Sequence, residues 1–138
     1  MNKKLIIFTD GGARGNPGPA AIGVVFGEPL NKTYGEQVGS ATNNVAEYRA
    51  LIFALKKAKQ LLGKKQARET AIEVRSDSEL VVKQQRGEYQ VKDAGLAPLF
   101  IEVWNLRQEF KSVLFTIVRR EENREADALV NRALDTLL

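Results

Sequence analysis

The order of the hydrophobic patterns is the feature that most restricts how this 138-residue chain can fold. Three short apolar runs come first, at Lys4–Thr9, Ala20–Phe26 and Lys32–Val38. Such runs predict strands, and the turn residues Glu28–Asn31 between the second and third predict that these first strands pair antiparallel. Helical patterns and strand patterns then alternate, which is typical of parallel strands joined by helical crossovers.

The remainder of the chain predicts four helices and two further strands. Apolar residues recur every three to four positions in the helical segments. Thr42 or Asn43 can cap the first long helix, and Gly63 ends it. The helices are expected at Asn43–Leu62, Ser78–Gln85, Leu96–Phe110 and Glu122–Leu137, the strands at Ala71–Arg75 and Val113–Val118, and a polar loop at Arg86–Ala94. This order predicts an α/β fold in which helices pack on a five-stranded mixed sheet.

The composition excludes several kinds of chemistry. The chain has no Cys and no His, so disulfides, thiol nucleophiles, thiolate metal sites and imidazole bases are excluded. Any metal must be bound by oxygen ligands, which favours Mg²⁺ or Mn²⁺. No apolar stretch approaches the ~20 residues that span a bilayer, and the start is too short for a signal-peptide core. We therefore expect one cytoplasmic domain over residues 1–138.

The charge is mildly basic, with a net charge of +4 and a pI of about 9.4. This balance suits a polyanionic partner. Basic residues without any acid occupy the segment from Tyr48 to Arg68, and they are Arg49, Lys56, Lys57, Lys59, Lys64, Lys65 and Arg68. Two interpretations stay open. This basic face is either a solvated helix surface with cations near its C-terminus or a surface that follows a phosphate backbone.

Four acids stand next to strand ends or in early helix turns. Asp10 follows the first strand and Asp77 follows the fourth, so parallel pairing of these strands would bring the two together beyond their carboxyl ends. Glu47 and Asp127 lie early in the first and last long helices, beside the buried stripes. For Asp10 or Asp77 alone, a turn former or a helix cap is the better explanation. Glu47 alone can be a partner of the helix dipole, and Asp127 alone can be a surface acid near Arg124.

Convergence of all four acids would have a chemical consequence. Carboxylates packed together repel one another, and their pKa values rise unless divalent cations neutralise them. Two such cations about 4 Å apart clamp the attacking and leaving oxygens of an in-line phosphoryl transfer, a reaction that needs neither His nor Cys.

Two turn-rich segments flank these acids. Asp10–Pro19 is rich in glycine but lacks the Gly-Lys-Ser/Thr ending of a P-loop, so nucleotide binding by that motif is not expected. Glycines beside an acid still let a phosphate backbone approach closely. Thr42-Asn43-Asn44 forms a helix cap, and its amides are also suited to reading the sugar hydroxyls that distinguish RNA from DNA.

Four segments in this order together resemble type 1 ribonuclease H, and they are Asp10–Pro19, Thr42–Glu47, Arg75–Ser78 and Glu122–Asp127. The similarity spans essentially the whole chain and looks like the compact subgroup found in archaea and some bacteria. The resemblance implies a ribonuclease H-like fold, with the sheet in order 3-2-1-4-5 and helices on both faces. It also implies endonucleolytic hydrolysis of the RNA strand of an RNA/DNA hybrid, by in-line attack of water that leaves 5′-phosphate and 3′-hydroxyl ends.

The resemblance also implies roles for individual residues. The acids at the family's catalytic positions, which bind two Mg²⁺ or Mn²⁺ ions, are Asp10, Glu47, Asp77 and Asp127. The residues at its RNA-contacting positions are Gly11, Asn16, Asn43 and Asn44, and Thr42 stands at a DNA-phosphate contact. We expect a monomer that needs no protein partner and no membrane. Its substrate is expected to be the RNA/DNA hybrid, with double-stranded RNA as a further candidate.

The chain departs from the family pattern in two ways. Many members carry a His on a mobile loop before the last helix, whereas this chain has Arg119-Arg120-Glu121-Glu122, in which Glu121 or Glu122 is a candidate substitute. Some members also carry a basic, Trp-containing protrusion. The corresponding cations here are offset by acids, and we interpret the single Trp104 as structural. Hybrid binding then depends on the basic face or is weaker.

Two other functions are compatible with the pattern. A nuclease-dead module that binds RNA/DNA hybrids or double-stranded RNA is the main alternative, although no acid is missing. An ATP-binding domain of the sugar-kinase or actin type shares the sheet topology, but such proteins need two domains around the nucleotide.

Overall fold

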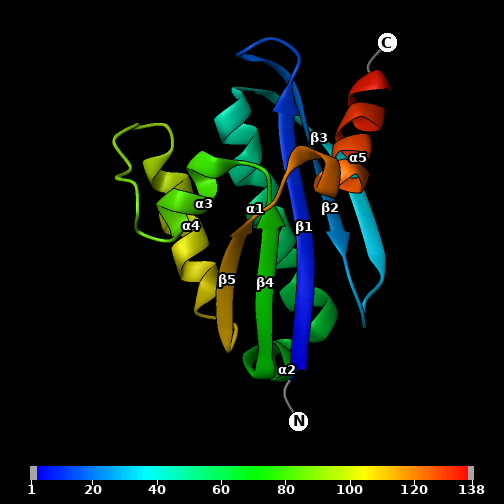
Figure 1. The fold of residues 1–138 in the computed structure, drawn as a ribbon, viewed down its shortest axis with the longest axis vertical. Coiled ribbons are helices and arrows are strands. Elements are labelled where there is room, and N and C mark those ends of the chain that lie inside the picture. The colour runs from blue at the N-terminus through cyan, green and yellow to red at the C-terminus, as the bar shows by residue number, and fades with distance from the viewer. Residues whose placement is uncertain (1–2, 137–138) are drawn as a thin grey trace.

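A computed structural model describes residues 3–136 and contains a five-stranded sheet in the order β3-β2-β1-β4-β5 (Figure 1). The strands are β1 (Lys3–Ala13), β2 (Gly18–Phe26), β3 (Lys32–Ala41), β4 (Thr70–Ser76) and β5 (Ser112–Ile117). Strand β2 pairs antiparallel with β1 and β3, whereas β4 pairs parallel with β1 and β5. The predicted mixed sheet and its strand order are confirmed.

Helices cover both faces of this sheet, as Figure 1 shows, with α1 behind it and α5 in front of β2 and β3. The helices are α1 (Asn43–Leu62), α2 (Lys64–Glu69), α3 (Glu79–Gln85), α4 (Ala97–Arg107), the short 3₁₀ helix η1 (Arg120–Asn123) and α5 (Arg124–Asp135). Thr42 caps α1 by accepting a hydrogen bond from the Val45 amide at 3.2 Å. None of the helices in the described part of the chain is long and apolar enough to cross a membrane.

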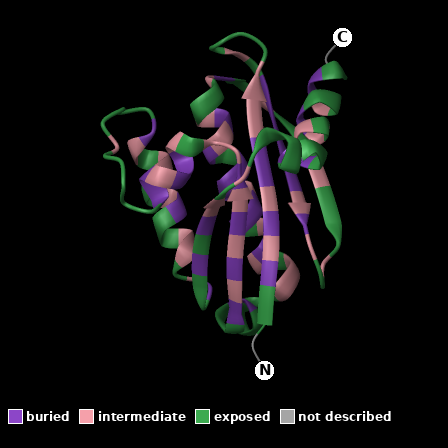
Figure 2. Cartoon of the chain, in the orientation of Figure 1, coloured by how far each residue is buried: buried purple, intermediate pink, exposed green. Residues whose placement is uncertain are grey.

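The larger core lies between the sheet and α1. Tyr48, Leu51 and Leu55 of α1 pack in one cluster with Leu5 and Ile7 of β1, and all are essentially inaccessible to solvent. On the other face, α5 buries a narrower stripe of Ala126, Val130 and Leu134. Buried and less buried residues alternate along β1 and β4, as the colour bands of Figure 2 show. This alternation follows from the two-residue period of a strand.

Several element boundaries differ from the prediction. The expectation that Asp10 ends a strand is wrong, because β1 continues to Ala13 and Asp10 pairs with Gly23 of β2. The parallel pairing with β4 does stop at Thr9, which pairs with Ser76, so Asp10 still lies beyond the end of the β1–β4 ladder. Helix α2 was not predicted, because only Ala67 of that polar segment is buried. The predicted last helix begins as η1, and Leu137 lies outside the described residues.

A glycine at position 11 is required by the packing of α1 on β1. A Cβ atom on Gly11 would collide with the backbone carbonyl of Ala46, whereas a Cβ atom on Gly12 would meet Val130 Cγ1 at an ordinary 3.6 Å. This contact brings α1, and with it Glu47, directly against the strand that carries Asp10.

We expect Gly11→Ala to lower the free energy of unfolding by about 1–3 kcal/mol, because the helix must move off the strand. Gly12→Ala is the matched control, and we expect it to change stability by less than about 0.5 kcal/mol. Urea denaturation measures both. Equal unfolding free energies for the two variants would show that the close approach of α1 is not constrained by Gly11.

Candidate active site

Three carboxylates from three different elements converge at one end of the sheet. Asp10 comes from β1, Glu47 from α1, and Asp77 directly follows β4. Each offers an oxygen atom, and these oxygens lie within 4.8 Å of one another. Asp10 is 7% exposed and is the most buried of the three. The predicted convergence therefore holds for these acids.

Asp127 of α5 lines the same pocket as the other three acids. It lies outside their tight group, but its carboxyl is within hydrogen-bonding reach of Asp10. Its Oδ2 accepts a hydrogen bond from Asn131 Nδ2 at 3.4 Å, one helical turn further along α5. All four predicted acids thus face one pocket, with Asp127 at the edge of the cluster.

The inward orientation of Glu47 is set by its hydrogen bonds. The backbone amide of Gly11 donates to Glu47 Oε1 at 2.6 Å, and the Ser78 side chain is a second hydrogen-bond partner. Ser78 itself caps α3, since its hydroxyl accepts from the Val81 amide at 3.4 Å. These contacts fix the Glu47 carboxyl toward the other acids instead of toward solvent.

Burial and mutual repulsion make this cluster electrostatically unfavourable at neutral pH. Burial, followed by the charges of Asp77 and Asp127, raises the pKa of Asp10 from its ordinary 3.8 to about 7. Burial also raises the pKa of Glu47, and the charges of Asp10 and Asp77 add to this. Burial raises the pKa of Asp77, and the positive charge of Arg120 counteracts part of this rise. An all-oxygen cluster of this kind fits hard divalent cations.

Two arginines in the pocket were not predicted from the sequence. Arg120 of η1 lines it beside Asp77, and Arg14 lines it from the turn between β1 and β2. The Arg14 guanidinium forms an ion pair with Asp135 at 2.6 Å, which holds the turn against α5. Arginine is the side chain best suited to phosphate oxygens, but nothing in the sequence distinguishes these two arginines from the others near the acids.

The predicted nucleic-acid contacts surround the start of α1. The backbone amide of Asn43 donates to Asn16 Oδ1 at 3.0 Å, and the amide of Ala13 donates to Asn43 Oδ1 at 2.9 Å. These bonds tie the glycine-rich turn to α1 and use both amide oxygens inside the protein. Thr42 uses its hydroxyl oxygen as the helix cap, and Asn44 is exposed beside it.

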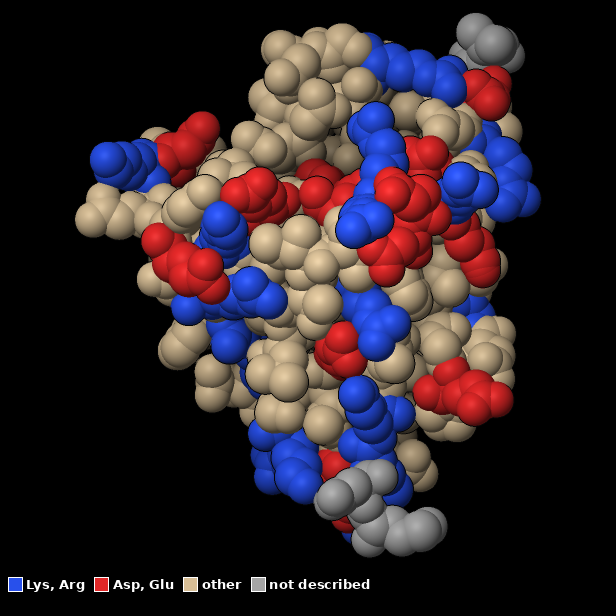
Figure 3. All heavy atoms as spheres, in the orientation of Figure 1, with Lys and Arg blue, Asp and Glu red and all other residues tan. Residues whose placement is uncertain are grey.

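Much of the basic face is occupied by contacts within the protein. Lys56 and Lys59 form ion pairs with Glu102 and Glu109 of the α4 region at 3.0 and 3.1 Å. Lys57 Nζ lies 5.2 Å from the centre of the Tyr34 ring. The cations of α2 belong to the lower, basic end of the molecule, whereas acidic side chains gather near the upper end of β4 (Figure 3). The proposed phosphate-following role of this face stays a prediction.

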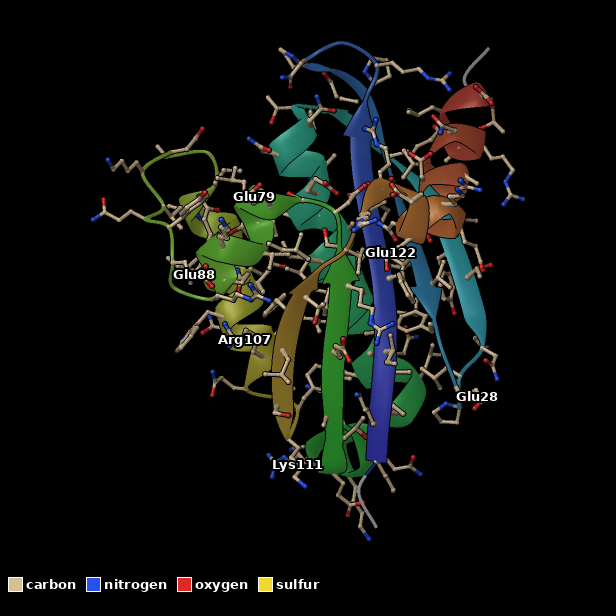
Figure 4. All side chains as sticks on the ribbon, in the orientation of Figure 1. Glu28, Glu79, Glu88, Arg107, Lys111 and Glu122 are labelled. Atoms are coloured by element: carbon tan, nitrogen blue, oxygen red, sulfur yellow. The ribbon has the colours of Figure 1, made fainter. Side chains whose placement is uncertain are left out.

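The segment in place of the family's His-bearing loop is η1. Glu122 Oε1 accepts a hydrogen bond from the Arg119 amide at 3.1 Å, which closes the start of η1. Figure 4 shows Glu122 at this turn, on the near side of the molecule. Arg120 is the member of Arg119–Glu122 that lines the acid pocket. Trp104, interpreted as structural, is 49% exposed and stacks on the Arg107 guanidinium at 5.1 Å.

Comparison with known proteins relates this site to one family. The model of the reverse transcriptase-like family matches residues 8–133. Ribonuclease HI of Halobacterium salinarum is 41% identical over 131 residues, which cover 93% of this chain and 63% of that protein. A bifunctional protein of Mycobacterium tuberculosis is 40% identical over 136 residues, which cover 96% of this chain and 36% of that protein. The chain thus spans only about a third of the mycobacterial relative.

The structural comparison agrees with the sequence comparison. The structure of LC11-RNase H1 in complex with an RNA/DNA hybrid superposes with a TM-score of 0.90 at 43% identity, covering 96% of this chain and 98% of that one. RNase H1 of Halobacterium salinarum superposes with a TM-score of 0.87 at 39% identity, covering 96% and 98%. The match of fold, sequence and acid cluster over nearly the whole chain places this protein in the ribonuclease H1 family.

Proposed function

We propose that the protein is a metal-dependent endonuclease that hydrolyses the RNA strand of RNA/DNA hybrids. The observation that carries this proposal is the meeting of Asp10, Glu47 and Asp77 within 4.8 Å, in a chain 43% identical to a ribonuclease H1 whose structure contains an RNA/DNA hybrid. We assign the binding of two Mg²⁺ or Mn²⁺ ions to these acids together with Asp127. A monomeric, cytoplasmic protein without an obligate partner stays a prediction.

The acids fit such ions in both chemistry and charge. Divalent cations in a carboxylate cluster neutralise the phosphate that is attacked and activate water for in-line displacement. Asp10, the most buried acid, stands next to Asp77 and Asp127 and interacts with Glu47 as well. The bond from the Gly11 amide holds Glu47 in place before any ion binds, so the protein loses little conformational freedom when it binds metal.

The surroundings of the acids suit a duplex that contains RNA. We assign RNA contacts around the 2′-hydroxyl groups to Gly11, Asn16, Asn43 and Asn44. The Thr42 hydroxyl uses its oxygen in the helix cap, which leaves its hydrogen for a phosphate of the DNA strand. Since sugar hydroxyls distinguish RNA from DNA, these contacts make the reaction specific for the RNA strand.

The proposed function is tested with one end-labelled RNA presented as a hybrid, as duplex RNA and as a single strand, with DNA duplex as the control. We expect cleavage of the hybrid in Mg²⁺ or Mn²⁺ to give products with 5′-phosphate ends, and EDTA to abolish it until excess Mg²⁺ is added. Hybrid cleavage that persists in EDTA would contradict the metal mechanism. Tight hybrid binding with no cleavage in either metal would identify a nuclease-dead binding module instead.

A further inference from the structure

One buried amide connects the three segments that carry Asp10, Asp77 and Asp127. Asn123 ends η1 directly before α5 and is 1% exposed. Its Nδ2 donates a hydrogen bond to the carbonyl oxygen of Thr9 at 2.9 Å, one residue before Asp10. The same side chain lies within hydrogen-bonding reach of the Asp77 carboxylate. Asp127 follows four residues later, on the first turn of α5.

The position of Thr9 explains why a side chain is needed there. The parallel β1–β4 ladder ends at the Thr9–Ser76 pair. Beyond it, β1 continues alongside β2 while the chain after β4 turns away toward α3. The two acids on either side of this divergence, Asp10 and Asp77, are therefore no longer held together by strand pairing. Asn123 is bonded to β1 at Thr9 and reaches the Asp77 carboxylate just after β4, at the point where the two strands separate.

The oxygen atom of the Asn123 side chain indicates that folding alone does not require an amide at this position. Asn123 Oδ1 is buried, and no group in the described part of the chain donates a hydrogen bond to it. A buried acceptor without a partner costs free energy, which an apolar side chain of similar size avoids. The presence of an amide here is therefore explained by the contacts of its Nδ2 group with Thr9 and Asp77. It is not explained by complete hydrogen bonding of the side chain.

We propose that Asn123 is a positioning residue for the metal-binding acids, holding the backbone before Asp10 and the carboxylate of Asp77 in the relative placement that divalent cations require. This inference rests on the proposed function. Partners that orient metal ligands without touching the metal typically change metal affinity by about 10- to 100-fold when they are removed. Because Asn123 is buried, its loss leaves the surface that meets a nucleic-acid duplex intact.

The test compares Asn123→Ala with Gln85→Ala. Gln85 is a matched control because it is also a buried amide, 4% exposed, with one unpaired atom, Nε2, and it lies on α3 outside the acid pocket. Mn²⁺ binding to the protein without nucleic acid is measured by titration calorimetry. The melting temperature of each protein variant is measured as well, together with its kcat and KM for cleavage of an RNA/DNA hybrid. Asn123→Ser, which keeps a smaller donor, serves as a second variant if the alanine variant does not fold.

We expect Asn123→Ala to weaken Mn²⁺ binding at least about tenfold, to lower kcat at subsaturating Mn²⁺, and to leave KM within about twofold. Asn123→Ser should lie between it and the wild type. Gln85→Ala should lower the melting temperature while Mn²⁺ affinity stays within about twofold of the wild type. Asn123 variants that lose thermal stability but bind Mn²⁺ as the wild type does would overturn the proposal. Wild-type protein that binds Mn²⁺ but leaves hybrids intact would overturn the proposed function alone.

Discussion

Replacing Asp10 by asparagine is expected to lower kcat on an RNA/DNA hybrid by about a thousandfold or more, while the Kd for the hybrid changes by less than about threefold. Asp10 is the most buried of the clustered acids and interacts with all of the others. An amide of the same shape cannot supply the negative charge that holds divalent cations in the cluster. Loss of about 4 kcal/mol of transition-state stabilisation corresponds to a thousandfold in rate.

The measurement uses steady-state cleavage of a labelled hybrid in Mg²⁺ to obtain kcat, and hybrid binding in a buffer that contains EDTA to obtain Kd. Asp93→Asn is the matched control, because it makes the same change of charge in the loop before α4, where Asp93 accepts a hydrogen bond from the Gly95 amide. The control should cleave at the wild-type rate within about twofold. Turnover by Asp10→Asn at more than a tenth of the wild-type rate would remove Asp10 from the catalytic machinery.

The fold was predictable wherever burial leaves a periodic pattern. Helix α1 repeats Leu51, Leu55 and Ala58 along its buried side, and its predicted bounds match the observed Asn43–Leu62. The extension of β1 past Asp10 was missed because two consecutive glycines, Gly11 and Gly12, are typical of a turn. They form a strand because they pair with Ile22 and Ala21 of β2, and residue 11 is glycine because α1 packs too closely for any other side chain. That constraint comes from the tertiary structure and has no local signature.

The site was predictable for the acids but not for the residues around them. Spacing alone gave each acid a simple local explanation, and only the resemblance of four segments to one family brought them together. Arg120 and Asn123 reach the acid cluster because η1 lies over the end of the β1–β4 ladder. The sequence predicted a continuous helix from Glu122, so η1 and the contacts it creates depend on the three-dimensional structure.

Metal-free protein is expected to lose stability as the pH rises from about 4 to about 7. A carboxylate in an ion pair has the opposite effect, because its pKa is lowered on folding and it adds stability as the pH rises. Asp10 ionises near its ordinary pKa of 3.8 in the unfolded chain but near 7 in the folded protein. The folded state therefore binds more protons between these values, and the free energy of unfolding falls as the pH rises through them. At about 1.4 kcal/mol for each unit of pKa, Asp10 alone accounts for a loss of up to about 4 kcal/mol.

Glu47 and Asp77, whose pKa values are also raised, shift stability in the same direction as Asp10, and groups outside the cluster do not obscure this window. The chain has no His, and the pKa of Glu73, lowered from 4.5 to about 2 by hydrogen bonding to Arg75, affects stability only below about pH 4.5. Urea denaturation at pH 5, 6, 7 and 8 in EDTA measures the effect, with Asp10→Asn as the control. The variant should show a flatter profile, in which burial of Glu47 and Asp77 still lowers stability as the pH rises, and should exceed the wild type in stability at pH 8.

Divalent cations should reverse this trend, because they bind the ionised cluster of the folded protein. Mg²⁺ or Mn²⁺ at about a hundred times its Kd adds about 2.7 kcal/mol to the free energy of unfolding, and this gain should grow from pH 5 to pH 8 as the acids lose their protons. In Asp10→Asn the gain should be much smaller. A metal-free wild type that becomes more stable between pH 5 and pH 8 would mean that the carboxylates do not repel one another in solution. The acids would then not need a cation to stay together.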